Sequence, residues 1–292
     1  MTTSKYSQEV QDTFQFLSDI HQHRERVGET GGVAPSWVKV TTITMLSNLK
    51  QRLDPEIIKA YFNKHKYVKL TKRGTRRFNA RRGTDTSNSW RLATTTFYNQ
   101  VSIKYEDYKS TKSIKIFPNG SIQVAGASDL IDCKAILTQL CIIMGAIFKK
   151  KFDINNYSIA MINTNFSLNR SLNLRNIFRV FSDAGMQTDF NPDRYSAVKI
   201  KIQPTPTAKR VTVSIFRTGK VIMTGAENLD EIARSYGIAL NTLCGSTSNV
   251  FHSVSSTPEY FGMYRGWPIA KLVQKLYSDG IVKNNVRTLR NV

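Results

Sequence analysis

The sequence has few of the residues on which metal and redox sites depend. Its 292 residues include three cysteines and four histidines. No CxxC pair occurs, and Cys133, Cys141 and Cys244 have no histidine nearby at the spacing of metal ligands. We therefore interpret the cysteines as small core residues in a reducing compartment, and we expect no metal site.

Catalytic signatures are missing as well. The sequence contains no phosphate-binding P-loop, no nucleophile elbow and no dinucleotide fingerprint. The histidines, His21, His23, His65 and His252, form no set with acids at the spacing of a metal site. We therefore expect a protein that is not an enzyme and that uses no cofactor and no small-molecule substrate.

Long uninterrupted apolar runs are also missing. No N-terminal stretch combines a basic start, an apolar run and a small-residue cleavage site, so we expect no secretory signal. The most apolar segment, Leu130 to Phe148, is interrupted by Asp132, Lys134 and Gln139. We predict a buried helix there and no membrane span.

Acidic residues are scarce relative to basic ones. The chain has 42 Lys and Arg against 21 Asp and Glu, which gives a formal net charge of +21. A dense positive field suits nucleic acid, an anionic membrane surface or an acidic protein. We favour nucleic acid, because each neutralised phosphate releases a counterion.

An internal repeat is the strongest pattern in the sequence. The matched blocks are Val38–Ile43 with Tyr157–Ile162, Tyr98–Lys104 with Tyr195–Lys201, and Ile114–Ala127 with Val213–Ala226. The blocks follow one another in the same order, which coincidence explains poorly. We predict an N-terminal extension at 1–36, a first repeat at 37–150, a second repeat at 151–244 and a C-terminal extension at 245–292.

Each repeat predicts the same elements. A β-branched strand precedes a helix, further strands alternate with period two, and a long helix follows. Gly120 and Gly219 fit tight hairpin turns, because glycine adopts positive φ freely. The expected helices are 54–63 and 129–148 in the first repeat, and 174–184 and 229–243 in the second. The pattern indicates an α+β fold in which each repeat forms an antiparallel sheet with helices on one face.

Strand alternation assigns residues to the two faces of each sheet. The expected core face of the second repeat consists of Val213, Ile215, Val221 and Met223. The opposite faces consist of Ser214, Phe216, Ile222 and Thr224 in the second repeat, and of Lys115, Phe117, Gln123 and Ala125 in the first. A phenylalanine at the same place on both helix-free faces is what insertion into a nucleic-acid groove requires.

The run Asp189–Val198, continuing to Ile215–Ala226, resembles the core of the TATA-box-binding protein family. The resemblance implies tandem repeats that form a saddle-shaped antiparallel sheet with helices on the convex face. It further implies a DNA-binding general transcription initiation factor, whose concave sheet docks in the minor groove of A·T-rich promoter DNA and bends it with aromatic wedges.

The resemblance also implies partners and a location. Double-stranded DNA is the expected partner of the sheet, and a transcription factor IIB-like factor and RNA polymerase are the expected partners of the convex helices. We expect no membrane partner. Such a protein acts in the nucleus, or in a cytoplasmic viral factory or virion if it is viral.

Site residues follow from the family pattern. The groove-wedging aromatics are expected at Tyr98, Phe117, Tyr195 and Phe216. Other residues expected to contact the groove are Val40, Ile159, Lys115, Gln123, Ile222 and Thr224. Phosphate contacts are expected from Lys104, Lys201, Arg217 and Lys220, which lie at strand edges or beside the hairpin turn.

Departures from the family pattern leave the sequence preference open. The family's groove-contacting threonine is kept at Thr224 but is Ala125 in the first repeat, and its paired asparagines fall on Val38 and Tyr157. The minor groove distinguishes A·T from G·C mainly through such contacts. An architectural or genome-packaging DNA-binding protein and a protein-interaction scaffold therefore remain alternative functions.

The first repeat contains a basic insertion at 64–90 that the family does not explain. Its residues expected to bind phosphates without sequence specificity are Lys72, Arg73, Arg76, Arg77, Arg81 and Arg82. A flexible arm beside the DNA, a solvated loop and a nuclear-localisation signal have the same composition. In the C-terminal extension, an aromatic cluster from Tyr260 to Trp267 either packs on its own domain or docks a partner.

Overall fold

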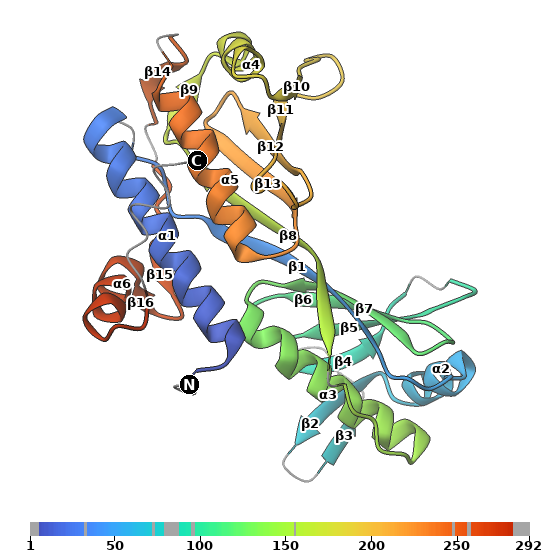
Figure 1. The fold of residues 1–292 in the computed structure, drawn as a ribbon. Coiled ribbons are helices and arrows are strands. Elements are labelled where there is room, and N and C mark those ends of the chain that lie inside the picture. Colours follow the sequence, from blue (N-terminus) through green and yellow to red (C-terminus); the bar gives the residue numbers. More distant parts are fainter. Residues whose placement is uncertain are drawn as a thin grey trace. The chain divides into compact units, whose positions relative to one another are not determined.

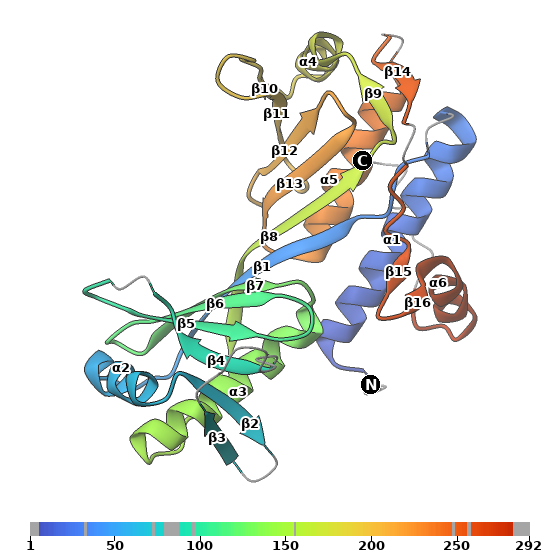
Figure 2. The same ribbon diagram turned by 180° about the vertical axis from the view of Figure 1, so that it is seen from behind.

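A computed structural model shows two compact units. It describes residues 6–31, 34–71, 74–78, 88–94, 97–154, 156–246, 249–255 and 258–282. The central unit is Thr42–Ala160, and the C-terminal unit combines Met1–Thr41 with Met161–Val292. Strands β1 and β8 each cross a boundary between these ranges. Figures 1 and 2 label the elements of both units.

The central unit is one antiparallel sheet with two helices. Its elements are β1 (Lys39–Asn48), α2 (Pro55–Lys64), β2 (Tyr67–Thr71), β3 (Gly74–Phe78), β4 (Ser89–Leu92), β5 (Val101–Glu106), β6 (Thr111–Ile116), β7 (Ser121–Ala127) and α3 (Leu130–Phe148). The strand order is β1-β7-β6-β5-β4-β2-β3. The apolar side of α3 is buried, including Cys133, Leu137 and Leu140. By length and composition, α3 is the one helix within the described ranges that could span a membrane.

The C-terminal unit repeats this arrangement and adds the two extensions. Its elements are α1 (Gln8–Gly31), β8 (Tyr157–Ser167), β9 (Arg170–Leu172), α4 (Leu174–Asp183), β10 (Gln187–Asp189), β11 (Ala197–Ile202), β12 (Val211–Phe216), β13 (Lys220–Ala226), α5 (Leu229–Cys244), β14 (Phe251–Val254), β15 (Met263–Tyr264), β16 (Trp267–Pro268) and α6 (Ile269–Ser278). The strand order of its main sheet is β10-β11-β12-β13-β8. The α+β class and the helix positions predicted from the sequence are confirmed.

Equivalent strand pairs keep the same register in the two units. Met45 lies opposite Val124 in the central unit, and Thr164 lies opposite Met223 in the C-terminal unit. Equivalent residues are therefore 119 apart in the first strand (164 minus 45) and 99 apart in the last (223 minus 124). The internal repeat is thus visible in strand pairing as well as in sequence.

Polar caps begin the four helices of the repeats at equivalent places. Asp54 and Asn173 cap α2 and α4, and Asp129 and Asn228 cap α3 and α5. Asn228 Oδ1, for example, accepts a hydrogen bond from the backbone N–H of Glu231 at 2.9 Å. Each cap satisfies backbone donors that the helix itself leaves unpaired.

The basic insertion is not the loop or flexible arm expected from its composition. Its described part forms the antiparallel hairpin β2–β3, which joins the sheet because β2 pairs with β4. Val68 of β2 lies opposite Trp90 of β4, and both side chains are fully buried. The Trp90 ring also stacks on Tyr105 at 4.4 Å. This buried apolar pair, rather than the charge pattern, decides the local structure.

The N-terminal extension forms a long helix that packs on the helices of the C-terminal unit. Helix α1 lies along α5 and contacts α6 (Figure 1). The Trp37 ring stacks on His21 at 5.7 Å and lies 4.4 Å from the Arg24 guanidinium. His23 is buried against Gly237 of α5, and burial lowers the pKa of its imidazole to about 4. The outer side of α5 is therefore covered by the chain's own helix.

The C-terminal extension is held beside the turn that follows β8. Asn169 donates from Nδ2 to the carbonyls of Ala34 and Glu259, each at 3.0 Å, and its Oδ1 accepts from the Glu259 N–H. Strand β14 pairs with β9. Tyr260 and Trp267 remain 60% and 64% exposed, so these two rings are only partly covered by their own unit.

Candidate nucleic-acid interface

Each sheet has one face under helices and one face without a described helix. The core residues predicted from alternation, Val213, Ile215, Val221 and Met223, are fully buried beneath α5. Their counterparts Ile114, Ile116, Ile122 and Val124 are buried in the central unit. Figure 2 looks onto the opposite face, where α5 lies behind β12 and β13. The predicted assignment of faces is confirmed.

Cross-strand pairing arranges the helix-free face of each unit in rows. In the C-terminal unit the first row is Lys199, Ser214, Ile222 and Asn165. In the central unit the first row is Ser102, Lys115, Gln123 and Leu46. These two rows occupy equivalent places in the repeat. The first row of the C-terminal unit has an exposed isoleucine where that of the central unit has a glutamine.

A second row lies beside the first in each unit. In the C-terminal unit it is Lys201, Thr212 and Thr224, and in the central unit it is Lys104, Ser113, Ala125 and Thr44. Lys201 Nζ donates to Thr212 Oγ1 at 2.6 Å. Both second rows contain a lysine at equivalent places, Lys201 and Lys104, where the sequence predicts phosphate contacts.

The structure brings together the two aromatics expected in the second repeat. The Tyr195 and Phe216 ring centroids are 5.8 Å apart at an interplanar angle of 65°. Lys199 Nζ lies 4.3 Å from the Tyr195 ring centre, close enough for a cation–π interaction. Phe216 is half-buried, and Tyr195 is 38% exposed. This pair is held in place before any partner binds.

The aromatics expected in the first repeat are less constrained. Phe117 is half-buried on the helix-free face, as Phe216 is. Tyr98, in contrast, is 96% exposed, and its neighbour Phe97 is 54% exposed. The central unit therefore holds one ring in its sheet and leaves a second ring in solvent.

The remaining predicted contacts differ in their surroundings. Arg217 is exposed, whereas Lys220 Nζ pairs with Glu259 Oε1 at 3.1 Å. Val40 and Ile159 are both half-buried and lie in strand segments of different units. In the basic insertion, Lys72, Arg73, Arg81 and Arg82 lie outside the described residues. Of Arg76 and Arg77 only the backbone in β3 is described.

Sequence reasoning missed two asparagines on β8. Asn165 lies opposite Ile222, and Asn163 accepts a hydrogen bond at its backbone oxygen from Thr41 Oγ1 at 3.0 Å. The side-chain Oδ1 atoms of both asparagines are buried without a hydrogen-bond partner. Val38, one of the two positions assigned by family pattern, is instead buried before β1 begins. Alternation continued along β8 from Ile162 would have placed Asn163 and Asn165 on the helix-free face.

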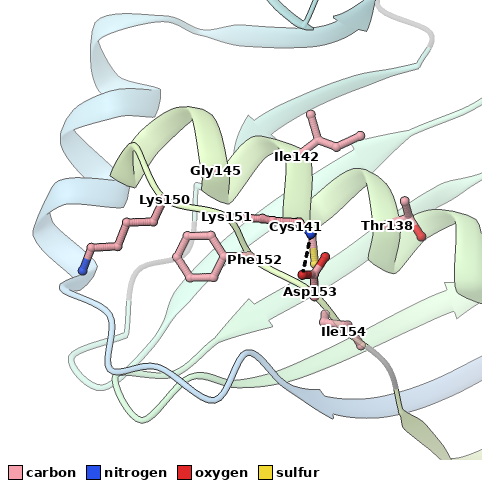
Figure 3. A pocket seen from close by; sticks show the side chains of 9 residues that line it. All are labelled: Thr138, Cys141, Ile142, Gly145, Lys150, Lys151, Phe152, Asp153 and Ile154. Atoms are coloured by element: carbon pink, nitrogen blue, oxygen red, sulfur yellow. Dashed lines mark ion pairs between the residues drawn. The ribbon is translucent and has the colours of Figure 1, made fainter.

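A hollow on the helical side of the central unit is a second candidate site. It has a volume of about 390 Å³ and lies between the end of α3 and the segment that follows it (Figure 3). Cys141, Gly145 and Phe152 are among its lining residues, and burial raises the pKa of the Cys141 thiol to about 11. The rim carries Ile142, which is 48% exposed, and Lys151, which pairs with Asp153.

The sequence comparisons find similarity to one family. The sequence model of the family "Transcription factor TFIID (or TATA-binding protein, TBP)" matches residues 156–244. A protein of Acanthamoeba polyphaga mimivirus named "TATA-box-binding protein-like" is 27% identical over 232 residues, which cover 68% of this chain. The match spans 63% of that viral protein's own length.

A solved structure of the same kind is also similar. The Methanococcus jannaschii protein described as "TBP" shares 14% sequence identity with this chain, at a TM-score of 0.49. The similarity covers 72% of this chain and 99% of the archaeal one.

Proposed function

The chain is a divergent TATA-box-binding protein-like protein, and from this premise we propose that it is a transcription initiation factor whose helix-free faces bind the minor groove of A·T-rich promoter DNA. The rings of Phe117 and Phe216 enter between base steps and bend the duplex. The proposal contains no catalytic step and no cofactor. Its place of action is the nucleus, or a viral factory if the source is a virus.

The observation that carries the proposal is the matched position of the two phenylalanines. Phe117 directly follows β6 and Phe216 ends β12, so each lies just before a glycine hairpin. The backbone oxygen of each accepts from the N–H of Gly120 or Gly219 at 2.9 Å. Each side chain is half-buried on the helix-free face. A half-exposed aromatic ring in this position can stack on a base when another molecule covers the face.

The chemistry of the C-terminal unit favours A·T base pairs. The minor groove of A·T presents only acceptors, and that of G·C adds the guanine amino group. Ile222 is 37% exposed and offers an apolar surface to the groove floor. The hydroxyl of Thr224 can donate to a groove acceptor. A guanine amino group placed against Ile222 would lose its hydrogen bonds to water.

One observation favours a second function. The central unit has Lys115 and Gln123 where the C-terminal unit has Ser214 and Ile222. A more polar and basic face suits an architectural DNA-binding protein that uses phosphates and DNA deformability more than base identity. The two functions differ in sequence preference and agree on which face binds.

Binding across a salt series separates these functions. We expect an A·T-rich duplex to be bound at least ~10-fold more tightly than a G·C-rich duplex at every salt concentration, in line with base-pair costs of roughly 1–3 kcal/mol. Fluorescence anisotropy with both duplexes measures this ratio. Equal affinities with a steep salt dependence would support the architectural function, and no binding at moderate salt would exclude both.

We further propose that the helical side of the central unit binds an acidic segment of a transcription factor IIB-like protein. Helix α1 covers α5 in the C-terminal unit, whereas Lys134, Thr138 and Ile142 of α3 are exposed. The hollow beside Ile142 has apolar walls for one side chain, and the exposed Lys150 at its rim suits a neighbouring carboxylate.

An Ile142→Glu substitution tests this docking site. It places a negative charge at the rim, and we expect it to weaken binding of the factor to the protein–DNA complex by at least ~10-fold, as for truncation of an interface anchor. Ala135→Glu is the matched control, since Ala135 is exposed on α3 and does not line the hollow. Equal binding by wild type and Ile142→Glu in a mobility-shift titration would refute the site.

A further inference from the structure

The two helix-free faces differ most at one pair of equivalent positions. Gln123 and Ile222 are 99 residues apart, the same spacing as Val124 and Met223 in the pairs that define the repeat register. Gln123 lies opposite Lys115 on one side and Leu46 on the other. In a DNA complex, both positions would face the floor of the groove.

Gln123 and Ile222 differ in their ability to form a hydrogen bond with guanine. In the minor groove the guanine amino group is a donor that A·T pairs lack. Gln123 carries a carbonyl oxygen that can accept from that donor and an amide that can donate to the acceptors that every base pair presents. Ile222 offers neither, so a guanine beneath it would lose water without gaining a partner.

The space left for a guanine amino group also differs between the two units, and it is larger in the central unit. The guanine amino group projects into the groove, so a protein that tolerates it must leave space there. In the second row Ala125 stands where the C-terminal unit has Thr224. The smaller side chain of Ala125 leaves the room that the larger Thr224 occupies.

The amide of Asn165 does not give the C-terminal unit the same capacity. Asn165 lies directly opposite Ile222, but its Oδ1 is buried and has no exposed surface for a base. Gln123 is half-exposed on its strand. The Gln123 side chain is therefore accessible from the helix-free face, whereas Asn165 Oδ1 is not.

We propose that Gln123 lets the central unit accept a G·C pair in the minor groove, while Ile222 restricts the C-terminal unit to A·T. This inference rests on the proposed function and assigns it a direction, because the protein then binds an asymmetric site with its central unit over the G·C-containing half. Lys115 donates to acceptors common to all base pairs and adds affinity without choosing between them.

Three duplexes test the inference: one A·T-rich throughout, one with a G·C pair in one half, and one with a G·C pair in both halves. We expect the wild-type protein to bind the first two within ~3-fold of each other and the third at least ~10-fold more weakly, since a mismatched pair typically changes affinity by that order. Equilibrium titration by fluorescence anisotropy gives the three affinities.

A reciprocal pair of substitutions provides the matched controls. Gln123→Ile should make the duplex with one G·C pair bind at least ~10-fold more weakly than the A·T duplex, and Ile222→Gln should remove most of the penalty for G·C in both halves. Both changes place a residue type that the other repeat already carries at the equivalent position. Thermal melting monitored by circular dichroism checks that each variant folds.

The outcomes separate this inference from the proposed function. The wild type and Gln123→Ile could both bind the A·T duplex best and lose affinity for the duplex with one G·C pair by the same factor. That result would overturn the half-site assignment and leave the proposed function standing. If all three duplexes bind the wild type equally, A·T preference fails and the inference fails with it.

Discussion

Replacing Phe117 and Phe216 together with alanine is expected to abolish bending of an A·T-rich duplex while leaving the fold intact. Both rings lie on the helix-free face and are half-buried, so their loss leaves the core beneath α3 and α5 unchanged. Base stacking on an aromatic ring is worth roughly 1–3 kcal/mol, so two rings account for roughly 2–6 kcal/mol of binding. End-to-end fluorescence transfer on a labelled duplex measures the bend.

Trp267→Ala is the matched control for this experiment. Trp267 is 64% exposed, so its removal deletes a large surface aromatic outside the proposed interface. We expect normal bending from this variant. Bending that survives in the double alanine variant would show that other residues insert into the DNA, and the assignment of the two phenylalanines would be wrong.

Substituting Gly219 with alanine is expected to destabilise the C-terminal unit strongly. Gly219 has φ +83°, and a Cβ atom there would collide with the carbonyl oxygen of Arg170. The backbone of this turn also accepts a hydrogen bond from the Leu168 N–H at 2.8 Å. We expect a loss of about 3 kcal/mol or more in unfolding free energy, because backbone strain and a steric clash act together.

Gly185→Ala separates the two causes. Gly185 also has a positive φ, +77°, but nothing lies within 4 Å of the position that a Cβ would take. The Gly185→Ala substitution should lower the unfolding free energy by only about 1 kcal/mol, because only the backbone conformation disfavours alanine there. Urea unfolding of both variants gives the comparison. Equal losses would mean that the close approach of Arg170 to the hairpin does not constrain it.

The parts of the fold that follow from local patterns could be predicted from the sequence. The helix 174–184 was expected and α4 spans Leu174–Asp183. Likewise, Gly120 and Gly219 occupy hairpin turns with φ near +82° and +83°. Period-two alternation also assigned Val213 and Ile222 to opposite faces, and their burial agrees. In each case the residues within a few positions along the chain are enough to predict the local structure.

The parts that depend on distant contacts could not be predicted. The hairpin β2–β3 exists because Val68 packs against Trp90, a pairing that the surrounding lysines and arginines conceal. Within the predicted N-terminal extension, helix α1 runs from Gln8 to Gly31, and Val27 near its end is buried in the same unit.

A crystal structure of the protein bound to an A·T-rich duplex tests the central claim most directly. We predict that the DNA covers the helix-free faces of both sheets and that the rings of Phe117 and Phe216 stand between base steps in the minor groove. DNA bound along the helical side, or held only by the basic hairpin with both rings uncovered, would contradict the account.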